Sequence, residues 1–400
     1  MENTDILVIG AGLAGLAAAA RLAVDRHSVT LADRAAPPPT DAGEAGADLR
    51  TTALLQPAIE TLRRAGAWEA MGAGAEALWT MRILDAGGRE NRAREKADFE
   101  SAEMGDRPFG WNVTNTGARR ALMERLASLG VAIRAPAGLE ALTLRDDAAF
   151  ARLADGSAIR AKLVIGADGR DSGVRAMAGV GVRRWDYGQH ALIFAVSHPR
   201  PHGGVSTEIH RSGGPFTLVP MPDRDGRHMS SVVWMLRSAE AAALTAADDA
   251  AFAEALNERS LGVLGRLSVE GRKAAWPIVG QLAHAMVARR VALMAEAVHV
   301  IPPIGAQGLN MSLADLEDLA QRLATARVAG ADIGAAALLG GYQRRRYPET
   351  LARVAGVDAL NRAARADMQP LRDLRRVGLA AVARLPFARR MAMKIGMGAG

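Results

Sequence analysis

The stretch Asp5–Val24 reads DILVIGAGLAGLAAAARLAV, an apolar run followed at once by a glycine-rich turn and an Ala-rich segment. The run DILVI predicts a short buried strand, and the Ala-rich segment predicts a helix. Gly10, Gly12 and Gly15 stand between them in the spacing G-x-G-x-x-G. Glycines at this spacing permit a sharp turn, a close approach of backbone to a pyrophosphate and close packing of helix on sheet. The three parts together predict a dinucleotide-binding site.

A second strand is predicted at Ser28–Ala32, and it ends at an acid, Asp33, which Arg34 follows. Asp33 lies 18 residues after Gly15, close to the roughly 20-residue spacing of the acid that binds the adenosine ribose in such folds. Strand, helix, strand and acid in this order favour dinucleotide binding over a chance glycine match. The motif leaves open which adenine-containing cofactor is bound.

A third buried strand is predicted at Leu163–Ala167 (LVIGA), and Asp168-Gly169 follows it directly. An Asp-Gly pair after a strand is also an ordinary turn, so this element alone does not establish a binding site.

The run Val291–Leu323 reads VALMAEAVHVIPPIGAQGLNMSLADLEDLAQRL, which predicts a strand, a turn rich in Pro and Gly, and a helix in succession. Pro302 and Pro303 stiffen the turn, and Gly305 and Gly308 allow a close approach of the backbone. The helix that follows offers unpaired N–H groups and its positive dipole end. The turn therefore suits a flat or anionic ligand, although a tight connection without a ligand fits the same pattern.

These segments occur together in the order and spacing of a known family. The three glycines near residue 10, Gly166–Gly169 and the segment Glu296–Asn310 resemble the single-component FAD-dependent aromatic hydroxylases of the para-hydroxybenzoate hydroxylase type. The chain looks most like the branch that hydroxylates polyprenylated phenols in ubiquinone biosynthesis. The resemblance runs along nearly the whole chain and includes Trp276-Pro277 and the tail from Tyr342 onward.

The resemblance implies an α/β fold in which a Rossmann-like FAD-binding domain is interleaved with a β-sheet substrate domain, followed by C-terminal helices. Strand-like runs at 191–197, 206–210, 215–220 and 230–235 fit the inserted sheet. The expected ranges are 1–75, 100–182 and 283–335 for the FAD domain, 76–99 and 183–282 for the substrate domain, and 336–400 for the C-terminal helical segment.

The resemblance also implies roles for single residues. Arg50, expected to open a helix after the loop 42–47, matches a family Arg that reaches FAD. On the helix predicted from Asn115 to Leu129, Arg119 or Arg120 could face the cofactor, but a solvated basic face is the simpler expectation. The residues expected at the cofactor are Gly10, Gly12, Ala14, Gly15, Asp33, Arg34, Arg50, Asp168, Gly169, Glu296, Gly305, Gln307, Gly308, Leu309 and Asn310.

The chain departs from the family pattern at two places. Ala295-Glu296 stands where the family has Gly-Asp, so the carboxylate expected at the ribityl chain is one methylene longer and a Cβ is added beside the cofactor. Ser312 stands where a Gly is common.

The wall of the substrate pocket is expected in the inserted sheet and at the flavin loop. The candidates are Phe216, Val219, Trp234 and Pro303, with Leu218, Met221 and Trp276 beside them. Each apolar residue in this set could equally be plain core.

The implied reaction uses NADPH or NADH to reduce FAD and O2 to hydroxylate a prenylated phenol through a flavin hydroperoxide. Because the cofactor carries this chemistry, no catalytic side chain and no metal are assigned; Pro303 and Gly305 border the reaction site, and His299 is expected to be structural. A prenyl-chain reductase and a flavin-binding scaffold of a lipid-synthesis complex remain alternatives. A halogenase is disfavoured, because no Trp-x-Trp pair occurs.

Composition sets further bounds. A chain of 400 residues with 49% hydrophobic content can bury a large core. No apolar run is long enough to span a bilayer, and the first strand leaves no room for a signal peptide, so a cytoplasmic location is expected. The chain has no Cys, which excludes disulfides and Cys nucleophiles. The net charge of +7 comes from dispersed Arg, and no nucleic-acid-binding motif is present.

One basic cluster stands apart from this dispersed charge. From Arg372 to Lys394 there are seven basic residues and one acid, Asp373, with apolar residues at helical spacing up to a break at Pro386. A terminal helix pair docked on the body fits this pattern. So does a peripheral contact with the inner face of the membrane or with a quinone-synthesis complex.

Overall fold

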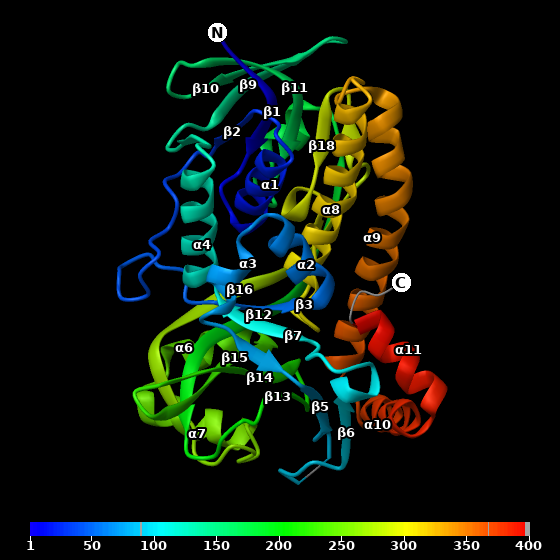
Figure 1. The fold of residues 1–400 in the computed structure, drawn as a ribbon. Helices are drawn as coiled ribbons and strands as arrows, with labels where there is room; N and C mark the ends of the chain where they lie inside the picture. The colour runs from blue at the N-terminus through cyan, green and yellow to red at the C-terminus, as the bar shows by residue number, and fades with distance from the viewer. Residues whose placement is uncertain (89, 367, 397–400) are drawn as a thin grey trace.

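The structure, a computed structural model, describes residues 1–88, 90–366 and 368–396. Two layered domains stand one above the other in Figure 1, and a group of C-terminal helices runs down one side. Residues 89, 367 and 397–400, which fall within the predicted ranges 76–99 and 336–400, lie outside the described residues.

The upper domain is built on a mainly parallel sheet. Its strand order is β17-β18-β11-β1-β2-β8, and β18, β11, β1, β2 and β8 are parallel to one another, which is the expected Rossmann-like arrangement. A hairpin, β9 and β10, extends β11. The bounds are β1 Glu2–Ile9, β2 Val29–Ala32, β8 Ile133–Arg134, β9 Leu139–Leu144, β10 Ala149–Leu153, β11 Ala158–Gly166, β17 Val287–Ala288 and β18 Val291–Leu293.

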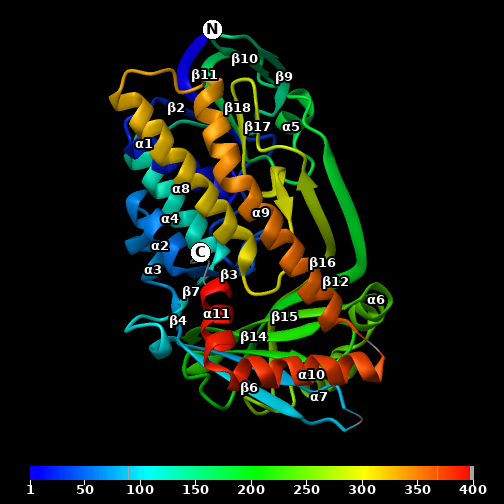
Figure 2. The same ribbon diagram turned by 90° about the vertical axis from the view of Figure 1, so that its right-hand side faces the viewer.

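Helices cover this sheet and bury its apolar side chains. Helix α1 packs against both α4 and α8, and α8 also packs against α9, the long helix that runs beside it in Figure 2. Strand residues such as Leu7 and Val164 are fully buried, as continuous apolar strands covered on both faces should be. The bounds are α1 Leu13–Val24, α4 Asn115–Ser128, α5 Gly173–Met177, α8 Gln307–Val328 and α9 Ala336–Ala364.

A three-stranded sheet, in the order β3-β7-β4, joins the two domains. The prediction that the residues after Arg50 open a helix is wrong, because they form β3 (Thr51–Leu55), and the helix begins only at Gln56. Pairing with β7 (Gly110–Thr114) decides this conformation. The remaining elements here are β4 Glu76–Leu78, α2 Gln56–Arg64 and α3 Trp68–Gly72.

The lower domain is a large, mostly antiparallel sheet, in the order β19-β16-β12-β15-β14-β13-β5-β6, with β13 and β5 parallel. All four strand-like runs expected in this region fall in observed strands. The domain boundaries themselves stay a prediction. The bounds are β5 Thr80–Asp85, β6 Glu95–Glu100, β12 Val182–His198, β13 Val205–His210, β14 Pro215–Arg224, β15 Arg227–Arg237, β16 Ser268–Ala283, β19 His299–Val300, α6 Ser238–Ala246, α7 Asp249–Arg259 and the 3-10 turns Ser101–Glu103 and Ala295–Ala297.

The chain ends in a helix pair, α10 (Gln369–Arg384) and α11 (Pro386–Gly396), separated at Leu385 as the proline predicts. Leu379, Val382 and the buried Met393 pack against β6 through Phe99. Among the described residues, no helix is both long enough and apolar enough to cross a membrane.

Candidate active site

The three sequence motifs meet at one edge of the parallel sheet. Strands β2, β1, β11 and β18 lie side by side, with Ile9 in register with both Ala32 and Gly166. Their carboxyl ends therefore bring Gly10, Asp33, Asp168 and the 3-10 turn of Ala295–Ala297 to the same edge. Ligands of open α/β sheets bind at this edge.

The glycines of the first turn are required for two different reasons. A Cβ on Gly15 would lie 1.8 Å from the carbonyl oxygen of Gly10, and one on Gly10 would lie 2.3 Å from that of Ala167. A Cβ on Gly12 would meet no protein atom within 4 Å, and the φ of Gly12 is an ordinary −69°. The protein's own packing thus explains Gly10 and Gly15, whereas Gly12 leaves open space beside the turn that a ligand can fill.

The start of α1 is open toward that space. Gly12 caps the helix without a side-chain hydrogen bond, and the first turn carries no acid. The N–H groups of Leu13, Ala14 and Gly15 therefore lack intrahelical partners and point with the positive dipole end toward an anion. The side chain of Ala14 has no polar atom, so Ala14 can serve this role only through its backbone N–H.

Asp33 and Arg119 border the same turn. The Oδ2 of Asp33 accepts from the N–H of Ala11 at 2.5 Å, and Oδ1 accepts from that of Ala35 at 2.9 Å. Arg119 is 5% exposed and donates to the carbonyl of Ala11 at 3.2 Å, while its Nε has no hydrogen-bond partner. Arg34 is exposed.

The sequence suggested that Arg119 lies on a solvated basic face, and this expectation is wrong. The interior of the domain takes up its guanidinium, and burial lowers the pKa of Arg119. A buried cation with an unpartnered Nε beside the glycine turn favours an anionic group in that turn. Arg120 instead donates to the carbonyl of Thr40.

The Asp168-Gly169 turn is tied to its own helix and to the flavin-side loop. Asp168 accepts from the Oγ of Ser172 at 2.5 Å and from the N–H of Val174 at 3.1 Å, so its carboxylate caps α5. Gly169 has a φ of +84° and open space around it. The buried Arg175 then donates to the carbonyl of Ala297 at 2.8 Å, which joins this turn to the loop after β18.

Arg50 lies in a polar network beside this edge. Its Nε and a terminal nitrogen each donate to Asp48 at 2.7 Å, and Asn115 donates to the same carboxylate at 2.8 Å. The paired Asp48 raises the pKa of Arg50, and the charge of Glu296 adds to this effect. The guanidinium also stacks over Trp276, 4.7 Å from the ring centroid, and so connects the cofactor domain with β16.

The loop after β18 exposes selected groups from an otherwise buried run. Glu296 is the one exposed residue between Val291 and His299. Farther along, Pro303, Gly305 and Gly308 are exposed while Ile304 is buried. Glu296, Pro303, Gly305 and Gly308 are thus exposed, although much of the surrounding segment is buried.

Helix α8 begins at this loop without a side-chain cap and without an acid in its first turn. The N–H groups that lack an intrahelical partner are those of Ala306 to Leu309. The N–H group of Leu309 is therefore among those without an intrahelical partner. Asn310 is the first residue of α8 beyond that group.

The side chains of Gln307 and Asn310 are occupied by protein. Gln307 donates to the carbonyls of Gly305 and Gly396, each at 3.0 Å, and accepts from Arg353 at 2.9 Å. Asn310 donates to the carbonyl of Ala53 and accepts from the N–H of Leu55, each at 2.8 Å. These two side chains shape the loop, which leaves its backbone for a ligand.

His299 belongs to a buried ion network. Its Nε2 lies 3.0 Å from Oδ2 of Asp315, whose other oxygen accepts from Arg346 at 2.8 Å. His299, Asp315 and Arg346 are 2%, 0% and 6% exposed. This network holds β19 and α9 on α8, which is the structural role expected of His299.

The large sheet turns two different apolar faces to its surroundings. Phe216 and Trp234 lie in the core with Phe252 of α7, with ring centroids of Phe216 and Trp234 5.5 Å apart. The opposite face carries Met235, which packs with Ile304 of the flavin loop. The prediction that Phe216 and Trp234 line the pocket is therefore wrong. Neighbouring side chains of a strand point to opposite faces, and these two point into the core.

The residues left on the loop side of the sheet form a different set. Val219 alternates with the core-facing Leu218 and so points to the loop side, and Pro303 lies on the loop itself. Beside them, the apolar side chains that pack around Ile304 on this face are Ala191, Ile193, Val233, Met235, Ile278 and Ile301.

The sequence pattern points to no role for Asp48, and it shows Arg175 one helical turn after Asp168-Gly169 without indicating its partner. Both are charged residues placed within six positions of an expected site residue, Arg50 or Gly169. Such proximity was the available signal, but their partners come from distant parts of the chain.

The geometry fits FAD. Gly12 leaves open space, α1 and α8 present free N–H groups, Arg119 has an unpartnered nitrogen, and Glu296 stands exposed. In the described part of the chain, no three His, Cys, Asp or Glu side chains lie close enough together to hold a metal ion.

Comparison with known proteins agrees with this geometry. Residues 3–354 match a family model described as an FAD binding domain. Ubiquinone hydroxylase UbiL of Rhodospirillum rubrum is 35% identical over 395 residues, which cover 98% of this chain and 89% of that protein. The 3-demethoxyubiquinol 3-hydroxylase of Escherichia coli is 31% identical over 400 residues, 99% of each chain.

A solved structure shows the same fold. The p-nitrophenol 4-monooxygenase PnpA from Pseudomonas putida superposes with a TM-score of 0.79 at 19% identity, covering 100% of this chain and 99% of that one. The family model and the two relatives of similar length show that the chain belongs to the FAD-dependent monooxygenases that carry this FAD binding domain, with ubiquinone hydroxylases among its relatives.

Proposed function

We propose that this protein hydroxylates a polyprenylated phenol of ubiquinone biosynthesis, using bound FAD, NADPH or NADH, and O2. The observation that carries the proposal is the similarity to ubiquinone hydroxylase UbiL along 98% of the chain, with all three FAD motifs at one sheet edge. When bound, FAD supplies the redox chemistry that activates oxygen.

The protein's own residues bind and orient the cofactor in this proposal. The turn Gly10–Gly15 holds the pyrophosphate on the N–H groups of α1, with Asp33 at the adenosine ribose. Asp168-Gly169 and Glu296 lie at the phosphate and ribityl regions. The free N–H groups at the start of α8, including that of Leu309, stabilise negative charge on the pyrimidine edge.

The substrate lies between the loop and the sheet in this proposal. Pro303 and Gly305 border the reacting ring, and the partly exposed Val219 and Val233 supply an apolar surface for a phenol that carries a prenyl chain. An apolar wall excludes water from the site where oxygen is transferred. No side chain of the described site is given an acid–base role, and His299 is hydrogen-bonded to Asp315.

The proposal extends to a peripheral contact. A prenylated substrate resides in lipid, so we place the contact with the membrane or with a quinone-synthesis complex at Arg372 to Lys394, on α10 and α11.

The test is the oxidation of NADPH or NADH by the purified holoprotein with and without a prenylated phenol under ¹⁸O2. We expect the phenol to stimulate oxidation and to gain one labelled oxygen. Flavin reduction without oxygen transfer to any prenylated phenol would contradict the proposal. Turnover without O2 would instead identify a prenyl reductase, and tight FAD binding without nicotinamide oxidation would identify a scaffold.

A further inference from the structure

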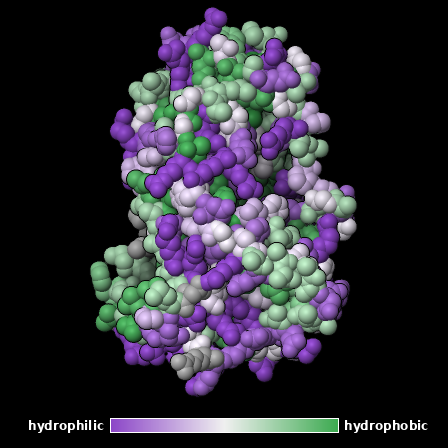
Figure 3. Space-filling model, turned by 180° about the vertical axis from the view of Figure 1, so that it is seen from behind, coloured by the Kyte–Doolittle hydropathy of each residue, from purple (hydrophilic) through white to green (hydrophobic). Residues whose placement is uncertain are grey.

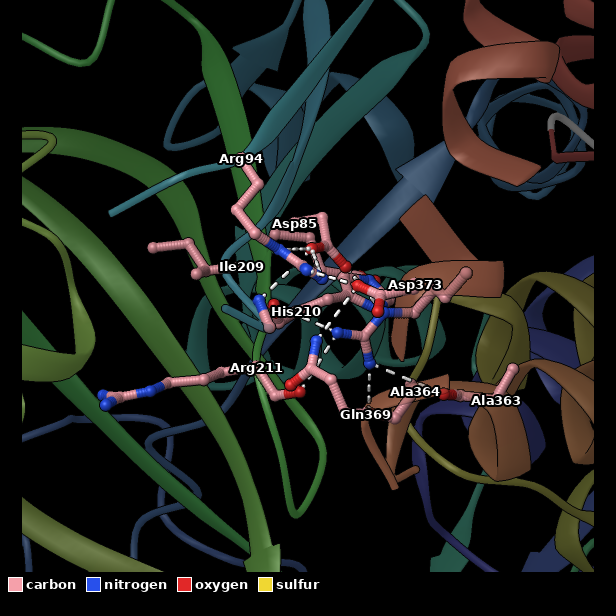
Figure 4. Close-up of polar contacts among 12 residues, drawn as sticks. Asp85, Arg94, Ile209, His210, Arg211, Ala363, Ala364, Gln369 and Asp373 are labelled. Atoms are coloured by element: carbon pink, nitrogen blue, oxygen red, sulfur yellow. Dashed lines mark hydrogen bonds and ion pairs between the residues drawn. The ribbon is translucent and has the colours of Figure 1, made fainter. Parts of the chain in front are cut away.

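One charged side chain of α10, that of Arg375, points toward the body of the protein. Arg375 donates to Oδ2 of Asp85 at 2.9 Å, and Arg94 donates to Oδ1 of the same residue at 2.8 Å. Asp85 is 0% exposed, and Figure 4 shows it among Arg94, His210 and Asp373. Arg375 also donates to the carbonyls of Arg211 and Ala364, each at 3.0 Å. These bonds fix which side of α10 meets the body.

Several apolar side chains of α10 are exposed. Leu371, Leu374 and Val377 are 48%, 67% and 58% exposed. A surface helix of a globular protein normally buries its Leu and Val and exposes its Arg. Helix α10 packs Leu379 and Val382 on the body and turns Arg375 inward, yet it leaves these three apolar side chains exposed. The exposed side chains therefore suit an environment other than water.

Helix α11 continues this surface. We define the outer face as the exposed apolar residues of the pair, which are Leu371, Leu374, Val377, Leu385, Phe387 and Met391. Phe387 is 78% exposed, the largest fraction in the set. In Figure 3, apolar side chains gather at the lower edge on the side where α10 and α11 lie. A contiguous exposed apolar patch of this kind marks a binding surface.

Cations surround the outer face. Arg376, Arg384, Arg390 and Lys394 are all exposed. The one acid of the pair, Asp373, is engaged by Arg94 at 2.6 Å and by Gln369 at 3.0 Å. The surface thus presents apolar side chains in a ring of positive charge.

We propose that the outer face of α10 and α11 is a docking surface for an anionic lipid bilayer, with Leu374 and Phe387 inserted among the headgroups. This inference rests on the proposed function, since a prenylated substrate is held in lipid, and it deepens the contact proposed at Arg372 to Lys394. Apolar residues flanked by Lys and Arg are the pattern of helices that lie in a membrane interface.

Charge favours lipid over a second copy of the chain. Two outer faces placed against each other would bring their cations together, which repel. An anionic bilayer neutralises the same cations, and its acyl region accepts the apolar side chains.

The docked pair would lie close to the flavin loop. The C-terminal end of α11 reaches that loop, because the carbonyl of Gly396 accepts from Gln307 at 3.0 Å. A bilayer on the outer face would therefore stand beside the loop that borders the proposed substrate site.

The test is flotation of the FAD-loaded protein with vesicles. One set contains phosphatidylcholine alone, and the other contains phosphatidylcholine mixed with phosphatidylglycerol. We expect binding to the mixed vesicles only, weakened by added salt. Leu374→Ser with Phe387→Ser should weaken binding roughly a hundredfold, since each buried side chain contributes strongly. Arg376→Gln, Arg384→Gln and Arg390→Gln together should weaken it at least roughly tenfold.

The matched control is Val328→Ser, because Val328 is 91% exposed at the end of α8, outside the outer face. It should bind vesicles as wild type does. All variants should hydroxylate a short-chain, water-soluble prenylated phenol at the wild-type rate. That measurement separates the two proposals. Vesicle binding without oxygen transfer would contradict the proposed function but would still support the docking surface.

Three outcomes would overturn the docking surface. The first is a wild-type protein that floats with neither vesicle, and the second is equal binding by the outer-face variants. The third is a wild-type dimer in sedimentation that Leu374→Ser with Phe387→Ser converts to a monomer, because the outer face would then bind a second copy.

Discussion

The two ends of the cofactor site meet the same backbone demand with different residues. At the nucleotide end, the positions that cannot accept a Cβ are glycines, Gly10 and Gly15. At the flavin end, Ala295 and Ala306 each have a φ of +55°, in the left-handed region that costs an L-residue energy. The nucleotide end is thus relaxed by its sequence, whereas the flavin end carries strain.

The surroundings explain how the flavin end keeps its shape. Tyr342 donates to the carbonyl of Leu293 at 3.0 Å just before Ala295, and Arg175 donates to that of Ala297 just after it. The ion network of His299, Asp315 and Arg346 holds the next strand. A strained backbone persists where its neighbours over-determine it. The contrast teaches that glycine meets the close approaches at the nucleotide end, whereas the flavin end, although it has Gly305 at a φ of +63°, also holds two Ala residues in the left-handed region by tertiary bonds.

The largest expected effect comes from filling the nucleotide turn. Gly15→Ala places a Cβ 1.8 Å from the carbonyl oxygen of Gly10, so α1 must move off the sheet. We expect a loss of about 4 kcal/mol or more in the free energy of unfolding, measured by urea denaturation. Gly43→Ala, in an exposed loop, is the control and should change little. A Gly15→Ala protein as stable as wild type would remove the contrast.

Next in size is the removal of the buried acid at the flavin end. Asp315→Ala leaves Arg346 and His299 buried without their partner. The expected cost is about 3 kcal/mol in the free energy of unfolding, because a buried cation loses its counter-charge. Asp318→Ala breaks only the i,i+4 pair with Arg322 on the same helix, and it should cost about 1 kcal/mol or less. Equal costs for the two variants would show that the network does not hold the loop.

Relieving strain at the flavin end should stabilise the protein. Ala295→Gly removes the Cβ at a φ of +55°, and we expect a gain of about 0.5–1 kcal/mol, reduced by the entropy of glycine. The control is Ala297→Gly in the same turn, whose φ is not in the left-handed region, and it should lose about 1 kcal/mol. Thermal unfolding of the apoprotein compares them. A destabilised Ala295→Gly protein would contradict strain at this position.

Glu296→Ala should affect the ligand and leave the fold unchanged. The Glu296 side chain is exposed and, within the described residues, makes no hydrogen bond or ion pair; it acts only through its charge on Arg50. We expect FAD to dissociate about tenfold more readily, because a hydrogen bond to a charged group is lost. Equilibrium dialysis of FAD measures this, with Glu296→Gln as an intermediate. Normal FAD retention by Glu296→Ala would show that this carboxylate is placed wrongly.

Local pattern carried much of this architecture. The glycine turn, the strands that end at Asp33 and Asp168, and the helix after Gly305 all rest on neighbouring residues, and the structure has each of them. The break between α10 and α11 follows in the same way from one proline.

Features decided by distant residues were harder to predict. Residues 51–55 became β3 because β7 and Asn310 pair with them, the latter 255 residues from Leu55. The prediction that Phe216 and Trp234 line the pocket is wrong, because the sequence of a sheet with two apolar faces does not reveal which face meets the flavin loop. The burial of Arg119 depends on the carbonyl of Ala11, 108 residues away.

Gly12→Ala tests the central claim, that the glycine turn is shaped around FAD, most directly. The new Cβ meets no protein atom within 4 Å, so the free energy of unfolding of the apoprotein should fall by no more than about 1 kcal/mol, the cost of replacing an N-cap Gly with Ala. Titration of that apoprotein with FAD, followed by flavin fluorescence, should show affinity at least about tenfold weaker, because the Cβ enters the space of the pyrophosphate. FAD binding as tight as wild type would contradict the account.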